Sequence, residues 1–214
     1  KVAEEQIYPE EKLHILAEGT ACGLDLKRFS KKETSEKNRI EIRSKFNIKA
    51  NDILIGFAGR LTEDKGISTL INSFLRISKD FNNVYLFVLG ELDFDRGGLK
   101  KSSQQAIKTN DKIIPVGVFA EIEKYYSAMD IFVLPSRREG FGNVLIEAAA
   151  MELPTVTTNA TGCIDAVIDG ETGFIVEIDN VEQLAQSISK LICDKELRER
   201  FGEQGCERVK QLFK

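Results

Sequence analysis

The sequence predicts an α/β fold in which a doubly wound parallel sheet is covered by helices on both faces. Short apolar runs alternate with amphipathic helical segments from residue 53 to residue 192, and glycine-rich loops follow the first and fourth runs. Apolar runs of this length, separated by helices, are typical of parallel strands buried on both sides. Ligands of such sheets bind at the carboxyl ends of the strands, where the topology switches. The two loops are therefore the first candidates for a site.

The alternation begins with a predicted strand over Ile53–Ala58 and a loop over Gly59–Gly66. The next apolar residues are spaced i, i+3, i+4, i+7 and i+8, as on one face of a helix: Ile67, Leu70, Ile71, Phe74 and Leu75. Further strands are predicted at residues 84–89, 112–116, 131–134, 155–157 and 173–176. Further helices are predicted at residues 99–109, 121–129, 144–151, 181–192 and 195–214.

The first 45 residues show no such alternation of strands and helices. Residues 1–30 are predicted to be an extension, with a short strand at residues 12–16, where apolar and polar residues alternate. Residues 30–45 are strongly charged, and we expect a surface loop that enters a short helix. Charge runs of this kind are usually solvated faces, so no function is assigned to this one.

Composition excludes several classes of protein. Of the 214 residues, 42% are hydrophobic and 30% are charged, which is ordinary for a soluble domain with a sizeable core. The net charge of −4 supplies no general basic field, so no nucleic-acid partner is expected. The apolar runs are far shorter than a membrane span, and no signal-peptide pattern opens the chain.

The cysteines do not form a metal site. Cys22, Cys163, Cys193 and Cys206 include no C-x-x-C pair, and His14 is the only histidine. We expect four unpaired thiols in a reducing cytosol.

The loop Gly59–Gly66 carries two cations, Arg60 and Lys65, between a strand and a helix. Arginine offers a planar fork to phosphate oxygens and lysine a mobile point charge, so the pair could neutralise a diphosphate. The alternative is two solvated surface cations. Their position at a strand end, opposite the second glycine loop, favours the functional interpretation.

The second loop, Ser136–Gly142, leads into a helix and lies between two carboxylates, Glu139 and Glu147. Three interpretations compete: a glycosidase acid and nucleophile, a pair that recognises sugar hydroxyls, or two glutamates stabilised by a helix dipole. The first is disfavoured because a helix N-terminus lies between the carboxylates, and that N-terminus favours an anion. A phosphate between two hydroxyl-binding groups describes a nucleotide sugar.

Asp93-Phe94-Asp95 is a D-x-D pattern, which metal-dependent sugar transferases use to hold a divalent ion. Three residues are weak evidence, and the pattern follows Gly90 in a predicted loop. A solvated loop is the favoured interpretation, and no metal or other cofactor is expected.

In these motifs the chain resembles the C-terminal, donor-binding half of retaining two-lobed (GT-B) glycosyltransferases, the group 1 or family 4 enzymes. The resemblance covers about residues 50–195 at ordered spacings, and it rests on residues 59–66, Gly117, and residues 130–136, 139–148 and 169–174. It implies that residues 31–214 form a Rossmann-like nucleotide-sugar-binding domain. Residues 1–30 would be the interlobe linker and a remnant of the N-terminal lobe.

The resemblance also implies roles for individual residues. Arg60 and Lys65 would hold the diphosphate, and Glu139 would face the transferred sugar; these three form the catalytic set. Glu147 would accept hydrogen bonds from the ribose. The backbone of Gly140 to Gly142, with Phe141 between them, would face the sugar beside Glu139, and the amides around Val144 and Leu145 would cap the phosphates. The base would lie near Val116 to Val118. The remaining donor-binding positions would be Gly59, Gly117 and Asn143.

The implied reaction is transfer of a hexosyl unit, with retention, from a nucleotide diphosphate sugar to an acceptor hydroxyl. UDP is the expected nucleotide on family grounds. The segment Gly19–Gly23 is similar to that of transferases that build bacterial lipid-linked surface polysaccharides. The acceptor, a saccharide or lipid-linked saccharide, would bind through the missing N-terminal lobe. The full enzyme would be cytoplasmic, at the inner face of the membrane, and this chain alone would transfer poorly.

Two other functions remain open at this point. One is a nucleotide-sugar epimerase or phosphorylase on a related two-lobed fold. The other is a nucleotide-binding module without catalysis. The pattern from Glu139 to Glu147 favours transfer over the first, and an upstream Rossmann-like lobe would exclude the second.

Overall fold

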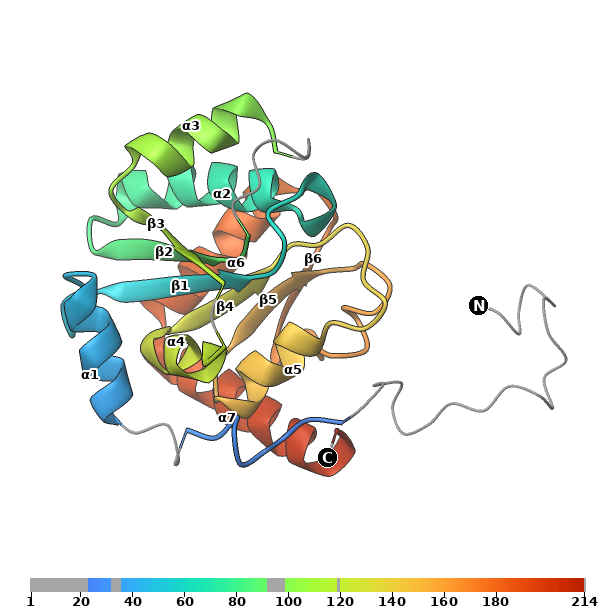
Figure 1. Cartoon of the computed structure of the whole chain (residues 1–214). Helices are drawn as coiled ribbons and strands as arrows, with labels where there is room; N and C mark the ends of the chain where they lie inside the picture. Colours follow the sequence, from blue (N-terminus) through green and yellow to red (C-terminus); the bar gives the residue numbers. More distant parts are fainter. Residues whose placement is uncertain (1–22, 32–35, 92–98, 119, 214) are drawn as a thin grey trace, which may run out of the picture.

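Six parallel strands form one sheet at the centre of the computed structural model, in the order β3-β2-β1-β4-β5-β6 (Figure 1). The structure describes residues 23–31, 36–91, 99–118 and 120–213. The strands are β1 (Ile53–Ala58), β2 (Val84–Leu89), β3 (Ile113–Gly117), β4 (Ile131–Leu134), β5 (Thr155–Thr158) and β6 (Gly173–Val176). All six lie where the apolar runs predicted them, and the predicted fold class is confirmed.

Helices cover both faces of the sheet (Figure 1). One layer holds α2 (Ile67–Asp80), α3 (Lys101–Thr109) and α6 (Val181–Cys193), with α2 packed on both of the others. The opposite layer holds α1 (Glu36–Lys45), α4 (Ile122–Ala128), α5 (Asn143–Ala150) and α7 (Lys195–Leu212), in which α1 packs on α4 and α5 on α7. A short 3₁₀ turn, η2 (Glu63–Lys65), precedes α2.

Local sequence explains where these elements form. The apolar face predicted for α2 is buried against the sheet, with Ile67, Leu70 and Ile71 fully inaccessible to solvent. Helix α6 begins after Asn180, whose side chain accepts a hydrogen bond from the Gln183 amide. Such caps satisfy amides that have no partner within the helix. Both signals are local, and this is why the sequence predicts these helices.

The strand order puts the topological switch point between β1 and β4. The chain leaves β1 towards β2 on one side and leaves β4 towards β5 on the other, so the loops that follow these strands lie side by side. Gly66 ends the first loop with a φ of 68°, and a Cβ there would lie 1.8 Å from the Pro135 carbonyl oxygen. Only glycine allows this close approach.

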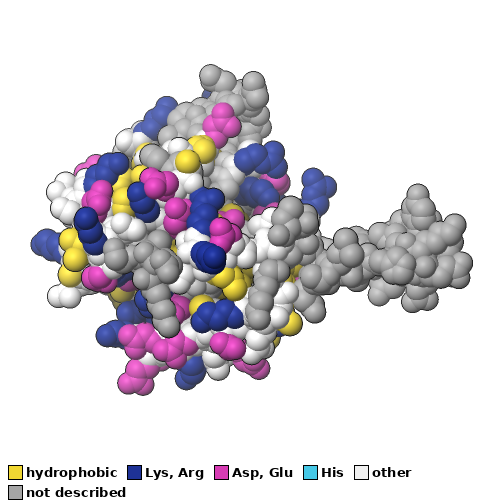
Figure 2. Space-filling view, turned by 60° about the horizontal axis from the view of Figure 1, so that its bottom comes forward, with side chains coloured by type: hydrophobic (Ala, Val, Ile, Leu, Met, Phe, Trp, Pro, Cys, Tyr) yellow, Lys and Arg dark blue, Asp and Glu magenta, His cyan; other side chains and the backbone are white. Residues whose placement is uncertain are grey.

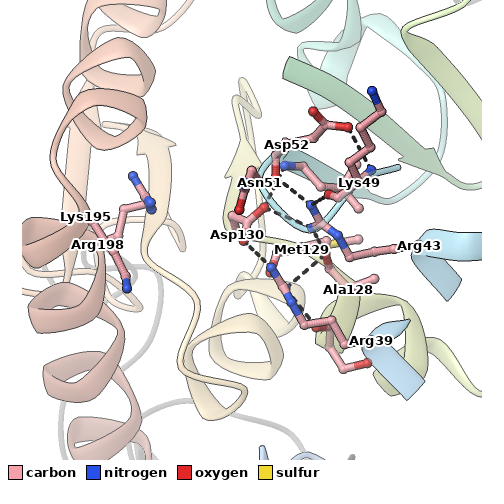
Figure 3. A network of polar contacts seen from close by, with 12 residues as sticks. Arg39, Arg43, Lys49, Asn51, Asp52, Ala128, Met129, Asp130, Lys195 and Arg198 are labelled. Carbon is pink, nitrogen blue, oxygen red and sulfur yellow. Dashed lines mark hydrogen bonds and ion pairs between the residues drawn. The ribbon is translucent and has the colours of Figure 1, made fainter. Parts of the chain in front are cut away.

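The expectation of a solvated charge run at residues 30–45 is wrong for Arg39 and Arg43. In α1 both side chains point into the protein and reach Asp130 at the start of β4, at 2.6 and 3.2 Å (Figure 3). Arg43 is 4% exposed and also donates to the carbonyl oxygens of Ala128 and Lys49. These buried oxygens need donors, so the two arginines dock α1 onto the sheet.

We expect Arg43→Ala to lower the free energy of unfolding by about 3 kcal/mol, because it leaves a partly buried carboxylate and several buried carbonyl oxygens without donors. Urea denaturation measures this difference. The matched control is Lys37→Ala on the exposed face of the same helix, which should cost less than about 0.5 kcal/mol. Equal losses in the two variants would contradict the docking role of Arg43.

Some sequence-based predictions fall outside the described residues. These are the strand at residues 12–16, His14, Cys22 and the Asp93–Asp95 pattern. Among the described cysteines, Cys163, Cys193 and Cys206 are free thiols. No helix in the described ranges is long and apolar enough to cross a membrane.

The surface in Figure 2 carries cationic and anionic side chains that are interspersed over the coloured, described residues. Apolar side chains on that face are scattered in small groups. Such a mixture gives this face no extended field of one sign to attract a polyanion.

Candidate functional site

The structure brings Lys65 and Glu139 together at the switch point. The Lys65 Nζ atom lies 2.6 Å from Glu139 Oε1, and the two side chains are 16% and 12% exposed. Lys65 ends η2 after β1, whereas Glu139 lies in the loop after β4. The Ser136 hydroxyl donates to the same carboxylate oxygen at 2.8 Å. A cation and an anion, each with little access to water, thus face each other across the two loops.

Lys65 and Glu139 both line a pocket of about 200 Å³. Its predicted members are Gly59, Lys65, Glu139, Phe141, Gly142, Asn143 and Val144. Sequence reasoning missed two further wall residues, Ala58 and Leu134. They are the last residues of β1 and β4, so the rule that ligands bind at the carboxyl ends of the strands could have found them.

Backbone contacts fix the two loops against each other. The Asp64 carbonyl oxygen accepts the Arg137 amide at 2.8 Å and the Ser136 hydroxyl at 3.3 Å. A turn at residues 160–166 supports the second loop, because the Gly162 carbonyl oxygen accepts the Gly142 amide at 3.0 Å. None of these supports was predicted, because contacts between distant residues leave no periodic pattern in the sequence.

Two of the first three amides of α5 are engaged within its first turn. The Asn143 amide donates to the Phe141 carbonyl oxygen and the Leu145 amide to that of Gly142, both at 2.8 Å. Among the described residues, the Val144 amide has no hydrogen-bond partner. The Leu145 amide is therefore engaged within the turn, and Val144 is the donor that a helix N-terminus can offer to an anion.

Arg60 does not line this pocket. Its side chain is 72% exposed and lies 3.6 Å from the Asp64 carboxylate. It remains on the same sheet edge, one residue after Gly59, so an anion bound at the pocket mouth would attract it through solvent.

Glu147 lies one turn inside α5, half-buried, and accepts a hydrogen bond from the Tyr126 hydroxyl at 3.0 Å. Burial raises the pKa of this carboxyl above its ordinary value of 4.5, against the opposing effects of the Tyr126 hydrogen bond and the Arg28 charge. Tyr126 is completely buried, so its hydroxyl is held in place beside Glu147. One carboxylate oxygen, Oε2, is thus held by the protein, and Glu147 does not line the pocket.

The residues predicted to bind a base lie at the end of β3, two strands from β1. Val116 is half-buried and Val118 is 74% exposed. The Gly117 carbonyl oxygen accepts the Gly90 amide at 2.9 Å, and the Leu89 carbonyl oxygen accepts the Gly59 amide at the same distance. The ends of β3, β2 and β1 therefore form one continuous edge that leads to the pocket.

The raised pKa of Glu147 has a consequence for stability. The folded state binds this proton more tightly than the unfolded state does, so the burial penalty is absent below about pH 4.5 and grows as the pH rises through the folded-state pKa. Glu147→Gln should therefore be more stable than the wild type at about pH 7, and the gap should close on acidification. Urea denaturation across this range measures the gap. The exposed Glu171→Gln is the matched control and should show no such pattern; a gap independent of pH at position 147 would refute the explanation.

The fold defines a Rossmann-like lobe of the GT-B type, with a pocket and the start of helix α5 at its switch point. The family model described as "Glycosyl transferases group 1" matches residues 38–208. The chain therefore belongs to the group 1 glycosyltransferases, which confirms the resemblance seen in its motifs.

Named relatives agree with this assignment. The chain is 38% identical to the capsular polysaccharide biosynthesis glycosyltransferase CapM of Staphylococcus aureus, over 100% of this chain and 54% of that protein. It is 32% identical to the lipopolysaccharide core biosynthesis glycosyltransferase LpsE of Rhizobium meliloti, over 80% of this chain and 48% of that protein. The chain thus spans about half the length of the curated relatives it matches.

Solved structures show the same lobe. The C-terminal domain of the group 1 protein LpcC from Francisella tularensis has a TM-score of 0.75 and 28% identity, over 88% of this chain and 97% of that domain. Anabaena HepE in complex with UDP-glucose has a TM-score of 0.80, over 89% of this chain and 52% of that protein. HepE is 24% identical, so that likeness concerns the fold alone.

Proposed function

We propose that this chain is the donor-binding half of a retaining glycosyltransferase that transfers a hexosyl unit from a nucleotide diphosphate sugar to an acceptor hydroxyl. The observation that carries the proposal is the Lys65–Glu139 pair in the switch-point pocket. A cation for phosphate and a carboxylate for hydroxyls, within one pocket, match the junction between the diphosphate and the sugar. The pocket of 200 Å³ is smaller than a typical ligand site, so it would hold that junction rather than the whole donor.

The leaving group determines what this half must do. As the bond to the anomeric carbon breaks, negative charge grows on the departing phosphate. Lys65, Arg60 and the Val144 amide would stabilise that charge more in the transition state than in the ground state, which is the condition for rate acceleration. Glu139 would accept hydrogen bonds from the transferred sugar, with the backbone of residues 140–142 beside it.

Glu147 would orient the ribose through the carboxylate oxygen that Tyr126 leaves free, and the base would lie along residues 116–118. UDP is the nucleotide we propose, and the UDP-glucose complex of HepE, a protein of the same fold, makes UDP-glucose the first donor to assay. We propose no metal cofactor, because Lys65, Arg60 and the helix start already supply positive charge for the diphosphate.

The role proposed for the whole enzyme is synthesis of a bacterial polysaccharide or a lipid-linked glycan, as the names of CapM and LpsE suggest for those proteins. The acceptor, a saccharide or lipid-linked saccharide, would bind to an N-terminal lobe. The reaction would take place in the cytoplasm at the inner face of the membrane, where lipid-linked acceptors and nucleotide sugars meet.

Ligand-detected NMR tests donor binding directly. The 214-residue chain is mixed with UDP-glucose, GDP-mannose and ADP-glucose, with and without magnesium, and signal transfer to each ligand is compared. We expect binding of a uridine donor that does not require magnesium. Absence of binding to all three would refute the donor-binding function, and a strict need for magnesium would revive the metal interpretation of Asp93 and Asp95.

A further inference from the structure

Phe213, the residue that directly follows α7, contacts the pocket loop, although neither the pocket lining nor any motif includes it. We name residues 139–142 the donor loop. The ring of Phe213 lies 5.6 Å from the ring of Phe141, centroid to centroid, at 58°. Phe213 is 1% exposed, whereas Phe141 is half-buried and lines the pocket. Phe213 therefore stands directly behind a pocket wall.

A second route connects the same end of α7 to the donor loop. The Arg208 guanidinium lies 5.7 Å from the centre of the Phe213 ring and donates to the Asp165 carbonyl oxygen at 3.1 Å. Asp165 belongs to the turn at residues 160–166, whose Gly162 accepts the Gly142 amide. Gly162 has a φ of 80°, and a Cβ there would lie 2.6 Å from the Gly140 carbonyl oxygen. The turn and the donor loop are thus in direct backbone contact.

The position of Phe213 is itself determined by its surroundings. Its carbonyl oxygen accepts the Leu24 amide at 2.9 Å, so the segment before α1 is bonded to the residue that follows α7. Helix α7 packs along α5, where Gly205 approaches Ala149 and the Cys206 thiol donates to the Ala150 carbonyl oxygen at 3.4 Å. The hydrogen bond from Leu24 and the packing of α7 on α5 thus fix the position of Phe213, and its ring limits the positions open to the Phe141 side chain.

We propose that Phe213 is a positioning residue for the donor, acting through Phe141. The proposal rests on the donor-binding function above and adds a residue that touches no ligand. Without the Phe213 ring, the Phe141 side chain would gain rotamers in the free protein. Donor binding would then have to order that side chain, which weakens affinity. Aromatic pairs of this geometry contribute beyond the apolar area they bury.

A merely structural role would make a different prediction, and the chain offers a matched control. Phe201 lies on the same helix, is also 1% exposed, and packs its ring 5.1 Å from that of Phe174. Neither Phe201 nor Phe174 lines the pocket. Phe201→Leu should therefore lower stability as Phe213→Leu does, while it leaves the donor site intact.

The experiment measures the Kd of UDP-glucose by titration calorimetry for wild type, Phe213→Leu, Phe201→Leu, Phe141→Leu and the double variant Phe141→Leu/Phe213→Leu, with Tm recorded for each. We expect Phe213→Leu to weaken binding about five- to tenfold and Phe201→Leu by less than about twofold at a similar loss of Tm. The double variant should bind about as weakly as Phe141→Leu alone, because the two rings act as one unit.

Two outcomes would overturn the proposal while leaving the donor-binding function intact. One is wild-type affinity in Phe213→Leu, and the other is equal weakening in Phe213→Leu and Phe201→Leu. If the wild-type chain binds none of UDP-glucose, GDP-mannose and ADP-glucose, the donor-binding function fails first and the positioning role fails with it.

Discussion

Lys65→Ala is expected to lower the rate of sugar transfer by a factor on the order of 10²–10³. Among the described residues that line the pocket, Lys65 is the one cation, and its side chain is 16% exposed. A charge so poorly screened by water acts strongly on a leaving phosphate. For the isolated chain the same loss should weaken UDP binding by about 10- to 100-fold, as measured by titration calorimetry.

The variant also leaves Glu139 without its cation, so some loss of stability accompanies the loss of binding. Ser136 still donates to that carboxylate, and we expect the free energy of unfolding to fall by about 1–3 kcal/mol. Lys112→Ala is the control for net charge. Lys112 lies at the amino end of β3, whereas the pocket lies at the carboxyl ends of the strands, and its ammonium donates to the Asn82 carbonyl oxygen. Wild-type affinity for UDP and wild-type turnover in Lys65→Ala would remove the basis for the proposed function.

The fold was predictable because its signals are local. The apolar faces of α2 and α6 and the apolar run of each strand lie within a few consecutive residues, and the alternation of strand and helix then leaves few topologies. Gly66 could likewise be recognised as the last residue of the loop between β1 and α2. Its particular need for glycine, the approach of Pro135, depends on a residue 69 positions away and is visible only in the structure.

The charged segment shows where local reasoning fails. Arg39 and Arg43 look like the exposed cations around them, because a sequence does not show which charges have buried partners. Their partner Asp130 lies 91 and 87 positions away. A burial pattern can be predicted from periodicity, whereas a polar contact of this kind depends on the completed fold.

The candidate site divides in the same way. The two loops, Lys65 and Glu139 could be selected from residue type and from the position of each loop at a strand end. Their mutual distance could not, nor could the engagement of the Leu145 amide within its own turn. Phe213 gave no signal at all, since a buried phenylalanine at a helix end is ordinary core material until its neighbour is known to line a pocket.

Glu139→Gln is expected to change two measurements in opposite directions. The Glu139 carboxylate lies 2.6 Å from the Lys65 ammonium, the cation proposed to hold the diphosphate. Neutralising this carboxylate frees Lys65 and removes a negative charge from the pocket, so UDP should bind about three- to tenfold more tightly by titration calorimetry. Transfer should nevertheless fall by a factor on the order of 10², because a neutral amide is a weaker acceptor for sugar hydroxyls.

Glu139→Asp separates charge from shape, because it keeps the negative charge on a shorter side chain. Its affinity for UDP should not exceed that of the wild type, whereas its transfer rate should still fall. If Glu139→Gln instead binds UDP more weakly than the wild type, then Glu139 holds Lys65 in place for the phosphate rather than competing with it. If it binds more tightly, the ion pair is a resting arrangement that the donor must open, and Glu139 becomes free for the sugar only once the diphosphate has taken Lys65.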